Sequence, residues 1–376
     1  MAAAFALLPT AAEAHAQLVA SDPAPGSTLA AVPTEVTLVF SELVTPAGRG
    51  ISVYAPDGRL AQRGPARASG PELSVGMAGA GEGTYVVLFT VVSADTHPSR
   101  GQVTFNVGHS SAPRAPGFGG ADVGLVSPLG LLLQALARWL HLAGFALGFG
   151  AGAYALLLAG RPGSLRLAGL GVALLLVSEP VALVGQTASL DPAQTFDADA
   201  LAGMLGSAFG RVFGLRIGLA LLLWAVLGAL GQATWLRWAV PVLGAAMAFI
   251  DALAAHPIPA LPAAVAALLV GVHVGAMAVW VGGLAGFLAA PSAAFRVLAG
   301  WSAGLLVLSG AALALLHFAI PGQLLTTAYG LSLVVKLPLV GAALVLAWRG
   351  RRRWELAATA LVIATAGVLV SLPPPR

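Results

Sequence analysis

The chain has 376 residues, of which 58% are hydrophobic and only 9% are charged, and it carries a net charge of +4 and no cysteine. A soluble protein of this length would have about 25% charged residues, so most of the chain is expected to lie in a membrane, and this shortage of charge excludes nucleic-acid binding. The absence of cysteine excludes disulfides, thiolate metal sites and cysteine nucleophiles, so any metal must be held by nitrogen, oxygen or thioether sulfur.

Residues 1–14 have the pattern of a signal peptide. Their apolar run ends in Ala12-Glu13-Ala14, the small-x-small pattern of a signal-peptidase site, although no positive charge precedes it. Cleavage after Ala14 would make His15 the new N-terminus. The alternative is cleavage after Ala16, which would leave Gln17 first and discard the histidine.

Residues 15–108 are predicted to form a small antiparallel β-sandwich of Greek-key type. Short runs with period-2 alternation are separated by turns rich in proline and glycine, and these runs are "EVTLVF", "ISVYAPDG", "TYVVLFTVVS" and "GQVTFNV". Val36, Leu38 and Phe40 share one face, as the core of a sandwich requires. Residues 109–127 are rich in glycine, proline, serine and alanine, which predicts a flexible linker.

Residues 128–376 are predicted to form an all-α membrane domain. A helix needs about 20 apolar residues to cross a hydrocarbon core, and eight segments meet this requirement, at 129–159, 164–188, 207–230, 235–255, 261–289, 294–319, 326–348 and 353–371. Arginines fall in alternate connections, at Arg161 and Arg166, Arg237, Arg296, Arg349 and Arg351–Arg353. The positive-inside rule assigns these connections to the cytoplasm. The β-domain is then on the outer, periplasmic side of a bacterial cytoplasmic membrane.

The eight segments are predicted to be two parallel repeats of four. "MLGSAFGRVFGLRIG" and "LLTTAYGLSLVVKLP" each contain an aromatic-Gly pair with a cation six residues after the glycine, Arg216 or Lys336. His141 in "RWLHLAGFALGFG" aligns with His273 in "GVHVGAMAVWVGG", and each has a glycine nine residues further on. Since each copy has an even number of helices, both would insert with the same orientation.

Polar residues inside the predicted helices are candidates for function, because they are costly in lipid. His273, Met277 and Trp280 share one helix face, which pairs an imidazole with a thioether, two side chains that could accept a metal ion. A structural alternative has the two cations pair with an acid and hold the bundle together. The candidate translocation path comprises His141, Glu179, Arg216, His273, Met277 and Lys336, with His256 and His317 as weaker candidates at the membrane interface.

Two distant motifs in the β-domain bear on metal binding. A free N-terminal His15 would offer an amine and an imidazole, and Asp95 and His97 in "SADTHP" would add a carboxylate and a second imidazole. Such nitrogen and oxygen donors suit Cu(II). On its own, an Asp-x-His pair on a loop is better explained as a turn with solvated side chains.

The β-domain resembles the periplasmic copper-binding family CopC, in its start "HAQLVASDPAPGS" and in its loop "SADTHP". The resemblance implies that His15, Asp95 and His97 are Cu(II) ligands. Some relatives have a methionine-rich loop for Cu(I), whereas this domain has only Met77, which argues against a thioether site there.

The membrane part is similar to the CopD family in "HVGAMAVWVGGL", "YGLSLVVKLPLV" and "RRRWELAATA". This similarity implies copper passage across the cytoplasmic membrane by a protein that is not an enzyme. The copper would be Cu(II) at the β-domain and Cu(I) in the membrane domain, with a periplasmic copper donor or reductant as a partner. The sequence has no phosphate-binding loop, so nucleotide binding is not expected and transport would be passive or ion-coupled.

Two alternative functions remain open at this point. One is a haem-b membrane oxidoreductase, which would need two histidines facing each other at one depth, and His141 with His273 is the only obvious pair in the sequence. The other is a copper storage or sensing protein that transports nothing.

Overall fold

The computed structural model describes residues 16–79, 81–93, 96, 98–116, 127–160, 165–190, 195–256, 258, 260–318, 320–372 and 374–375. Its contacts divide the chain into two compact units. One contains residues 131–182 and 212–376, and the other contains residues 13–130 and 183–211.

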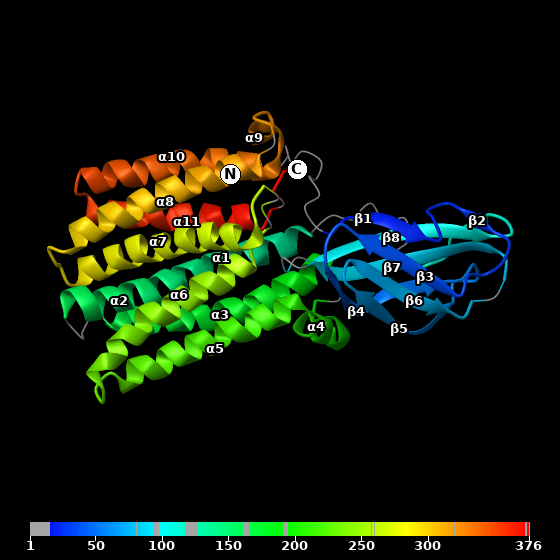
Figure 1. The fold of residues 1–376 in the computed structure, drawn as a ribbon, viewed down its shortest axis with the longest axis horizontal. Helices are drawn as coiled ribbons and strands as arrows, with labels where there is room; N and C mark the ends of the chain where they lie inside the picture. The colour runs from blue at the N-terminus through cyan, green and yellow to red at the C-terminus, as the bar shows by residue number, and fades with distance from the viewer. Residues whose placement is uncertain are drawn as a thin grey trace. The chain divides into compact units, whose positions relative to one another are not determined.

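The β-sandwich of the second unit consists of two four-stranded sheets (Figure 1). In order across the first sheet, the strands are β1 (Leu18–Asp22), β3 (Glu35–Phe40), β6 (Glu72–Met77) and β5 (Gln62–Ser69). In the second sheet they are β2 (Thr28–Leu29), β8 (Pro98–Val107), β7 (Gly83–Ser93) and β4 (Val44–Tyr54). All pairs are antiparallel except the two-residue pairing of β2 with β8. The predicted antiparallel β-sandwich is therefore confirmed.

The alternating residues of the strands form the core between the two sheets. Leu38, Ile51, Leu73, Tyr85 and Phe105 are fully buried there. Met77 ends β6 as a buried member of the same core. Its thioether therefore packs among apolar side chains.

Strands β1, β2, β5 and β6 were not among the predicted runs, although β6 does alternate between buried and less buried residues. Strand β5 lacks an apolar face. Its residues "QRGPARAS" are mostly exposed, and the strand lies at the edge of its sheet. Proline and charge are typical of edge strands, where they discourage pairing with other chains. The contacts of the domain also continue past residue 108, since Ser111 exchanges hydrogen bonds with Thr84 at 2.8 and 2.9 Å.

Eight helices within the described residues are long and apolar enough to cross a membrane, as predicted. The first is continuous over residues 128–159 and comprises α1 (Pro128–Phe145), the π-helical η2 (Ala146–Ala151), α2 (Gly152–Tyr154) and the π-helical η3 (Ala155–Ala159). The others are α3 (Leu165–Leu190), α5 (Ala208–Ala229), η6 (Thr234–Trp238) with α6 (Ala239–Leu253), α7 (Ala263–Ala289), α8 (Phe295–His317), α10 (Ala328–Trp348) and α11 (Arg352–Val370). Two short helices, α4 (Ala198–Leu205) and α9 (Gln323–Thr326), precede α5 and α10.

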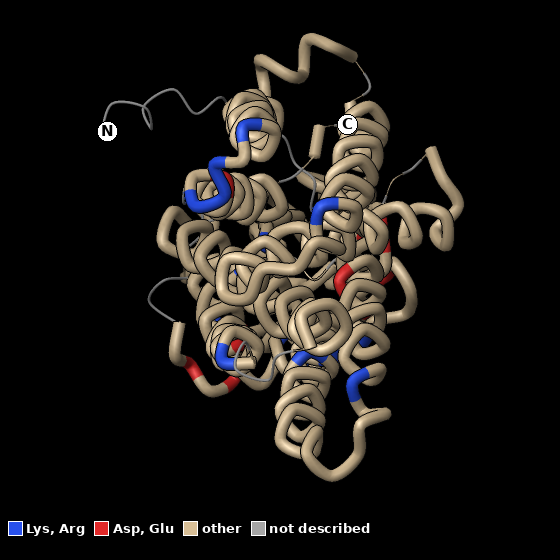
Figure 2. The backbone as a smooth tube through the Cα atoms, turned by 90° about the vertical axis from the view of Figure 1, so that its left-hand side faces the viewer, with Lys and Arg blue, Asp and Glu red and all other residues tan. Residues whose placement is uncertain are grey.

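Basic residues gather at one end of the membrane helices. The end of η3 and the start of α3 lie at the same end of the first unit as the α5–η6, α7–α8 and α10–α11 connections (Figure 1). Figure 2 views this end, and several of its turns carry lysine or arginine. The residues in or beside these connections include Arg166, Arg237, Arg296, Arg349 and Arg351–Arg353. This distribution is the basis of the predicted orientation, with Arg211 in the first turn of α5 as an exception at the opposite end.

Helix α7 crosses η2 at two glycines that the repeat makes equivalent. A Cβ atom on Gly150 would collide with the carbonyl oxygen of Ala278, and one on Gly282 would collide with the carbonyl oxygen of Ala146. Each alanine lies five residues, and each glycine nine residues, after the histidine of its own repeat. The two contacts are therefore the same contact made twice, as around a two-fold axis, and they support the predicted repeat.

The third helix of each repeat begins in the same way. Gly210 and Gly330, the glycines of the two aromatic-Gly pairs, press against backbone carbonyls of the preceding short helix, namely those of Leu205 and Gln323. Arg216 is the ninth residue of α5 and Lys336 is the ninth of α10. At 1.5 Å per residue, both cations lie about 12 Å from the start of their helix.

Candidate functional site

The predicted Cu(II) ligands of the β-domain, His15, Asp95 and His97, lie outside the described residues. Thr96, between two of them, is described and has a φ of 71°, a left-handed conformation that is rare for a β-branched residue. In the same unit, the Gln186 side-chain amide donates a hydrogen bond to the Thr96 carbonyl oxygen at 3.1 Å. The backbone between the two expected ligands is thus held by a buried side chain.

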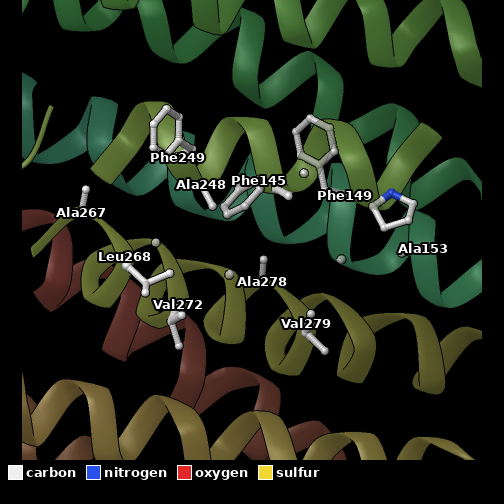
Figure 3. Close-up of a pocket in the computed structure, with 16 residues that line it drawn as sticks. Phe145, Phe149, Ala153, Ala248, Phe249, Ala267, Leu268, Val272, Ala278 and Val279 are labelled. Atoms are coloured by element: carbon white, nitrogen blue, oxygen red, sulfur yellow. The ribbon is translucent and has the colours of Figure 1, made fainter. Parts of the chain in front are cut away.

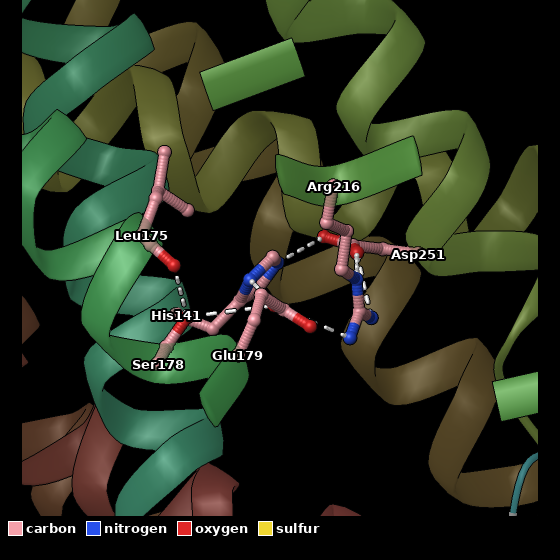
Figure 4. Close-up of polar contacts among 6 residues, drawn as sticks. All are labelled: His141, Leu175, Ser178, Glu179, Arg216 and Asp251. Carbon is pink, nitrogen blue, oxygen red and sulfur yellow. Dashed lines mark hydrogen bonds and ion pairs between the residues drawn. The ribbon is translucent and has the colours of Figure 1, made fainter. Parts of the chain in front are cut away.

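Four side chains from four helices of the first repeat meet inside the membrane domain (Figure 4). His141 comes from α1, Glu179 from α3, Arg216 from α5 and Asp251 from α6, and we call them the His141 network. The imidazole Nε2 lies 3.0 Å from Asp251 Oδ2, and Nδ1 lies 3.2 Å from Glu179 Oε1. The Arg216 guanidinium pairs with Asp251 Oδ1 through Nε at 2.9 Å and Nη2 at 2.8 Å, and Nη1 lies 3.8 Å from Glu179 Oε1.

The network is almost completely buried. The exposed fractions of the side chains are 7% for His141, 2% for Glu179, 8% for Asp251 and 21% for Arg216. Removing one partner from a buried ion pair leaves an uncompensated charge, which costs far more than an exposed pair contributes. The four residues are therefore expected to depend on one another.

One oxygen of the network has no partner. Among the described residues, nothing bonds to the buried Glu179 Oε2, and the Nδ1 contact of His141 is close without the alignment of a hydrogen bond. Ser178, the neighbour of Glu179, directs its hydroxyl to the Leu175 carbonyl at 2.8 Å (Figure 4). An orphaned buried acceptor needs an explanation in terms of bound water, ion or proton.

Asp251 is the functional candidate that sequence reasoning missed. An acid inside the apolar segment 235–255 is costly in lipid, and this cost is the signal that could have identified it. The structural alternative expected Arg216 and Lys336 to pair with an acid. Arg216 does pair with Glu179, but the shorter contacts of its guanidinium are to Asp251.

The second repeat brings different residues around its histidine. His273 Nδ1 lies 3.0 Å from the Ser309 hydroxyl, and its ring lies directly over Gly310, where an added Cβ would be 2.9 Å from the imidazole. Lys336 interacts electrostatically with His273. No ion pair to Lys336 occurs within the described parts of the chain, so the alternative in which an acid pairs with both cations fails for this one.

The histidine contacts of the two repeats use equivalent positions. "LLLVSE", which ends at Glu179, and "LLVLSG", which ends at Gly310, occupy the second helix of each repeat. Glu179 contacts His141, and Gly310 lies under His273. The second repeat therefore keeps the geometry but replaces the carboxylate with a hydrogen atom.

The remaining candidates of the second repeat have separate surroundings. Met277 is buried in an apolar cluster with Phe145 and Phe149. Trp280 instead donates its indole N–H to Glu355 Oε1 at 3.0 Å, and Arg352 binds the other oxygen of that carboxylate at 2.7 Å.

The two weaker histidine candidates lie near helix ends. His317 Nδ1 contacts the Leu313 carbonyl at 2.7 Å, and its ring stacks on Tyr329. His256 follows the end of α6 and is buried. The contacts of His317 fit a structural role.

An apolar pocket of about 430 Å³ lies between the first helix of the domain, α6 and α7 (Figure 3). Phe145, Phe149, Phe249 and Leu268 line it, and its lining contains no histidine or charged side chain.

Haem ligation needs a free imidazole nitrogen, but both nitrogens of His141 face carboxylates. The geometry thus gives no support to haem held between His141 and His273.

Within the described residues, no three histidines, aspartates or glutamates are arranged to hold a metal ion. The His141 network has three such residues, but they are bound to one another and to Arg216. Its contacts are ion pairs and hydrogen bonds among its own charged side chains.

Comparison with protein families finds two matches. Residues 18–108 match the CopC domain, and residues 289–361 match the family described as copper resistance protein D, or CopD. A comparison with curated proteins returns no match.

Two solved structures are similar to the β-domain. CopC from Methylosinus trichosporium OB3b is 31% identical, over 26% of this chain and 98% of that chain, with a TM-score of 0.24. PcoC, a methionine-rich copper resistance protein from Escherichia coli, is 29% identical, over 25% of this chain and 99% of that chain, with a TM-score of 0.21.

The CopD match begins at the end of α7 and extends into α11, so it falls in the second repeat. The CopC match covers the whole sandwich. The chain therefore joins a CopC domain to a membrane domain whose second repeat matches the CopD family, and the two families indicate copper handling.

Proposed function

We propose that this protein captures Cu(II) on the outer side of the bacterial cytoplasmic membrane and passes copper through its membrane domain. The observation that carries the proposal is the presence of a CopC domain and a CopD match in one chain. The one-sided arginines of the helix connections support an orientation with the β-domain outside. The protein acts as a transporter and not as an enzyme.

The capture site consists of His15, Asp95 and His97. Removal of the signal peptide frees the amine of His15, which chelates Cu(II) together with its own imidazole. Asp95 and His97 complete a nitrogen and oxygen donor set that suits this ion. The contact of Gln186 with Thr96 supports a loop held in place between the last two ligands.

The copper path in the membrane runs beside His273 and Met277, an imidazole and a thioether suited to Cu(I) after reduction by an external reductant. His273 is favoured as the residue that meets copper, because no carboxylate bonds to its ring in the described structure. Lys336 lies near the same histidine. His141, Glu179 and Arg216 contribute the charged lining of the first repeat.

Copper uptake into sealed vesicles tests the proposal. Vesicles with the wild-type protein should accumulate copper, and the His273→Ala variant should lose this activity while still binding one Cu(II) per chain. Wild-type vesicles that bind Cu(II) outside but accumulate none would show a storage or sensing protein. A Soret absorption band in the purified protein would favour the oxidoreductase.

A second experiment tests the N-terminal chelate. Inserting one alanine after Ala14 places an extra residue before His15 once the signal peptide is removed. Cu(II) affinity of the purified full chain should fall at least tenfold, because the amine can no longer close the chelate ring. Unchanged affinity would remove His15 from the site.

A further inference from the structure

The His141 network has an odd charge balance. Glu179 and Asp251 contribute two negative charges, and Arg216 contributes one positive charge. With a neutral imidazole the network would therefore hold one net negative charge, buried among apolar helices. Such a charge is costly unless a cation compensates for it.

The hydrogen-bonding capacity of the imidazole also indicates that His141 carries the compensating positive charge. A neutral histidine has one N–H donor and one acceptor nitrogen, whereas an ionised carboxylate can only accept. Both nitrogens of His141 lie within 3.2 Å of carboxylate oxygens. With a neutral ring, one of these contacts would set two lone pairs against each other. An imidazolium carries a proton on each nitrogen, so it donates a hydrogen bond to Asp251 and turns an N–H, rather than a lone pair, toward Glu179.

The ion pairs of the network join its own members to one another. Glu179 and Asp251 each contact both His141 and Arg216. On the other helices packed nearby, His273 of α7 contacts the Ser309 hydroxyl, and Glu355 of α11 is bound by Arg352. Arg138 lies one helical turn before His141 on α1 and has an interaction of its own. Within the network, His141 is therefore the group that can supply the missing positive charge.

We propose that the first repeat is a proton-binding site, in which the His141 network holds one exchangeable proton that His141 shares between Glu179 and Asp251. The buried Glu179 Oε2, which has no partner among the described residues, gives the proton a further acceptor inside the same network. Among the described residues, the second repeat has no such site, since Gly310 takes the place of the carboxylate beside His273. The inference depends on contacts and charge alone and stands whether or not the chain transports copper.

Solid-state nitrogen NMR of the full-length, histidine-labelled protein in lipid bilayers tests the proposal. Near neutral pH, one imidazole should carry protons on both nitrogens, and this signal should disappear in His141→Gln. Raising the pH should convert it reversibly to a neutral imidazole. A neutral His141 near neutral pH in the wild type would overturn the proposal without any variant.

Charge-removing variants give the sharper result. Asp251→Asn and Glu179→Gln each remove one negative charge, so the network balances with a neutral imidazole, and the imidazolium signal should be lost near neutral pH. The matched control is Glu355→Gln, which neutralises a buried carboxylate of the second repeat and should leave the signal intact. An imidazolium that persists in both network variants, with the His273 signal unchanged as a check of folding, would contradict the proposal.

Discussion

The two repeats of the membrane domain share a backbone plan and differ in charge. In each, a histidine of the first helix contacts the second helix, and a cation is the ninth residue of the third. The first repeat surrounds its histidine with two carboxylates and an arginine, whereas the second offers a hydroxyl, a glycine and a lysine. The packing of the helices therefore places polar groups at equivalent positions in both repeats, but the charges of these groups differ.

This divergence divides the chemistry between the repeats. His141 is occupied on both ring nitrogens by acids, which suits proton binding and leaves no nitrogen for a metal. His273 is held at Nδ1 by a neutral hydroxyl, which can fix the orientation of the ring without neutralising a bound cation. The CopD match lies within the second repeat but begins at residue 289, after His273, which contacts no acid among the described residues.

The largest difference between the repeats should appear when their cations are removed. Arg216→Met leaves two buried carboxylates without their fixed counter-charge, and we expect a loss of stability of about 3–5 kcal/mol. Lys336→Met removes a cation that has no ion pair within the described residues, and should leave stability unchanged or raise it. Thermal unfolding in detergent measures the stability of both variants. Equal losses of stability would show that the different surroundings of the two cations do not affect stability.

Substituting either glycine at the crossing of α7 and η2 should reduce the stability of the protein by a similar amount. Gly150→Ala and Gly282→Ala each place a methyl group against the backbone of the other repeat, so each should cost a similar amount, about 1–3 kcal/mol. Gly275→Ala is the matched control on α7, because its Cβ would meet no atom within 4 Å. Thermal unfolding again gives the measurement. Very different losses at the two crossing glycines would break the equivalence of the repeats.

The smallest loss of stability is expected for a substitution of Gly310, the glycine that lies beneath the His273 ring. Gly310→Ala adds a methyl group 2.9 Å from the imidazole, and the ring can rotate away at a cost below about 1 kcal/mol. If His273 meets copper, this displacement should reduce uptake into vesicles severalfold. Gly304→Ala on the same helix has open space around its Cβ and should change neither property. Normal uptake by Gly310→Ala would place the path elsewhere.

The sequence predicted the fold wherever the apolar pattern was strong. The eight membrane helices and strand β3 follow directly from hydrophobic length and alternation. Strand β5 could not be predicted, because an exposed edge strand has no alternation to detect. The π-helical turns in the first membrane helix also leave no trace in an apolar pattern, since the change lies in backbone hydrogen bonding.

The site was only partly predictable from sequence. The repeat correctly indicated that Arg216 and Lys336 are equivalent, because both follow the same aromatic-Gly pair. It could not indicate that Asp251, 35 residues further along, is the partner of Arg216, because pairing between helices depends on their rotation in the bundle. Nor could it show that Gly310 takes the place of Glu179, since a glycine in an apolar helix resembles any packing residue.

The doubled glycine contact between Gly150 and Gly282 has a consequence for how such a domain can specialise. An isologous contact of this kind would also join two identical four-helix proteins into a dimer. In such a dimer every substitution occurs twice, so an acid gained beside one histidine is gained beside both. With both copies in a single polypeptide, one repeat can acquire two carboxylates beside its histidine while the other acquires none. The two repeats can then have different chemistry within the same packing.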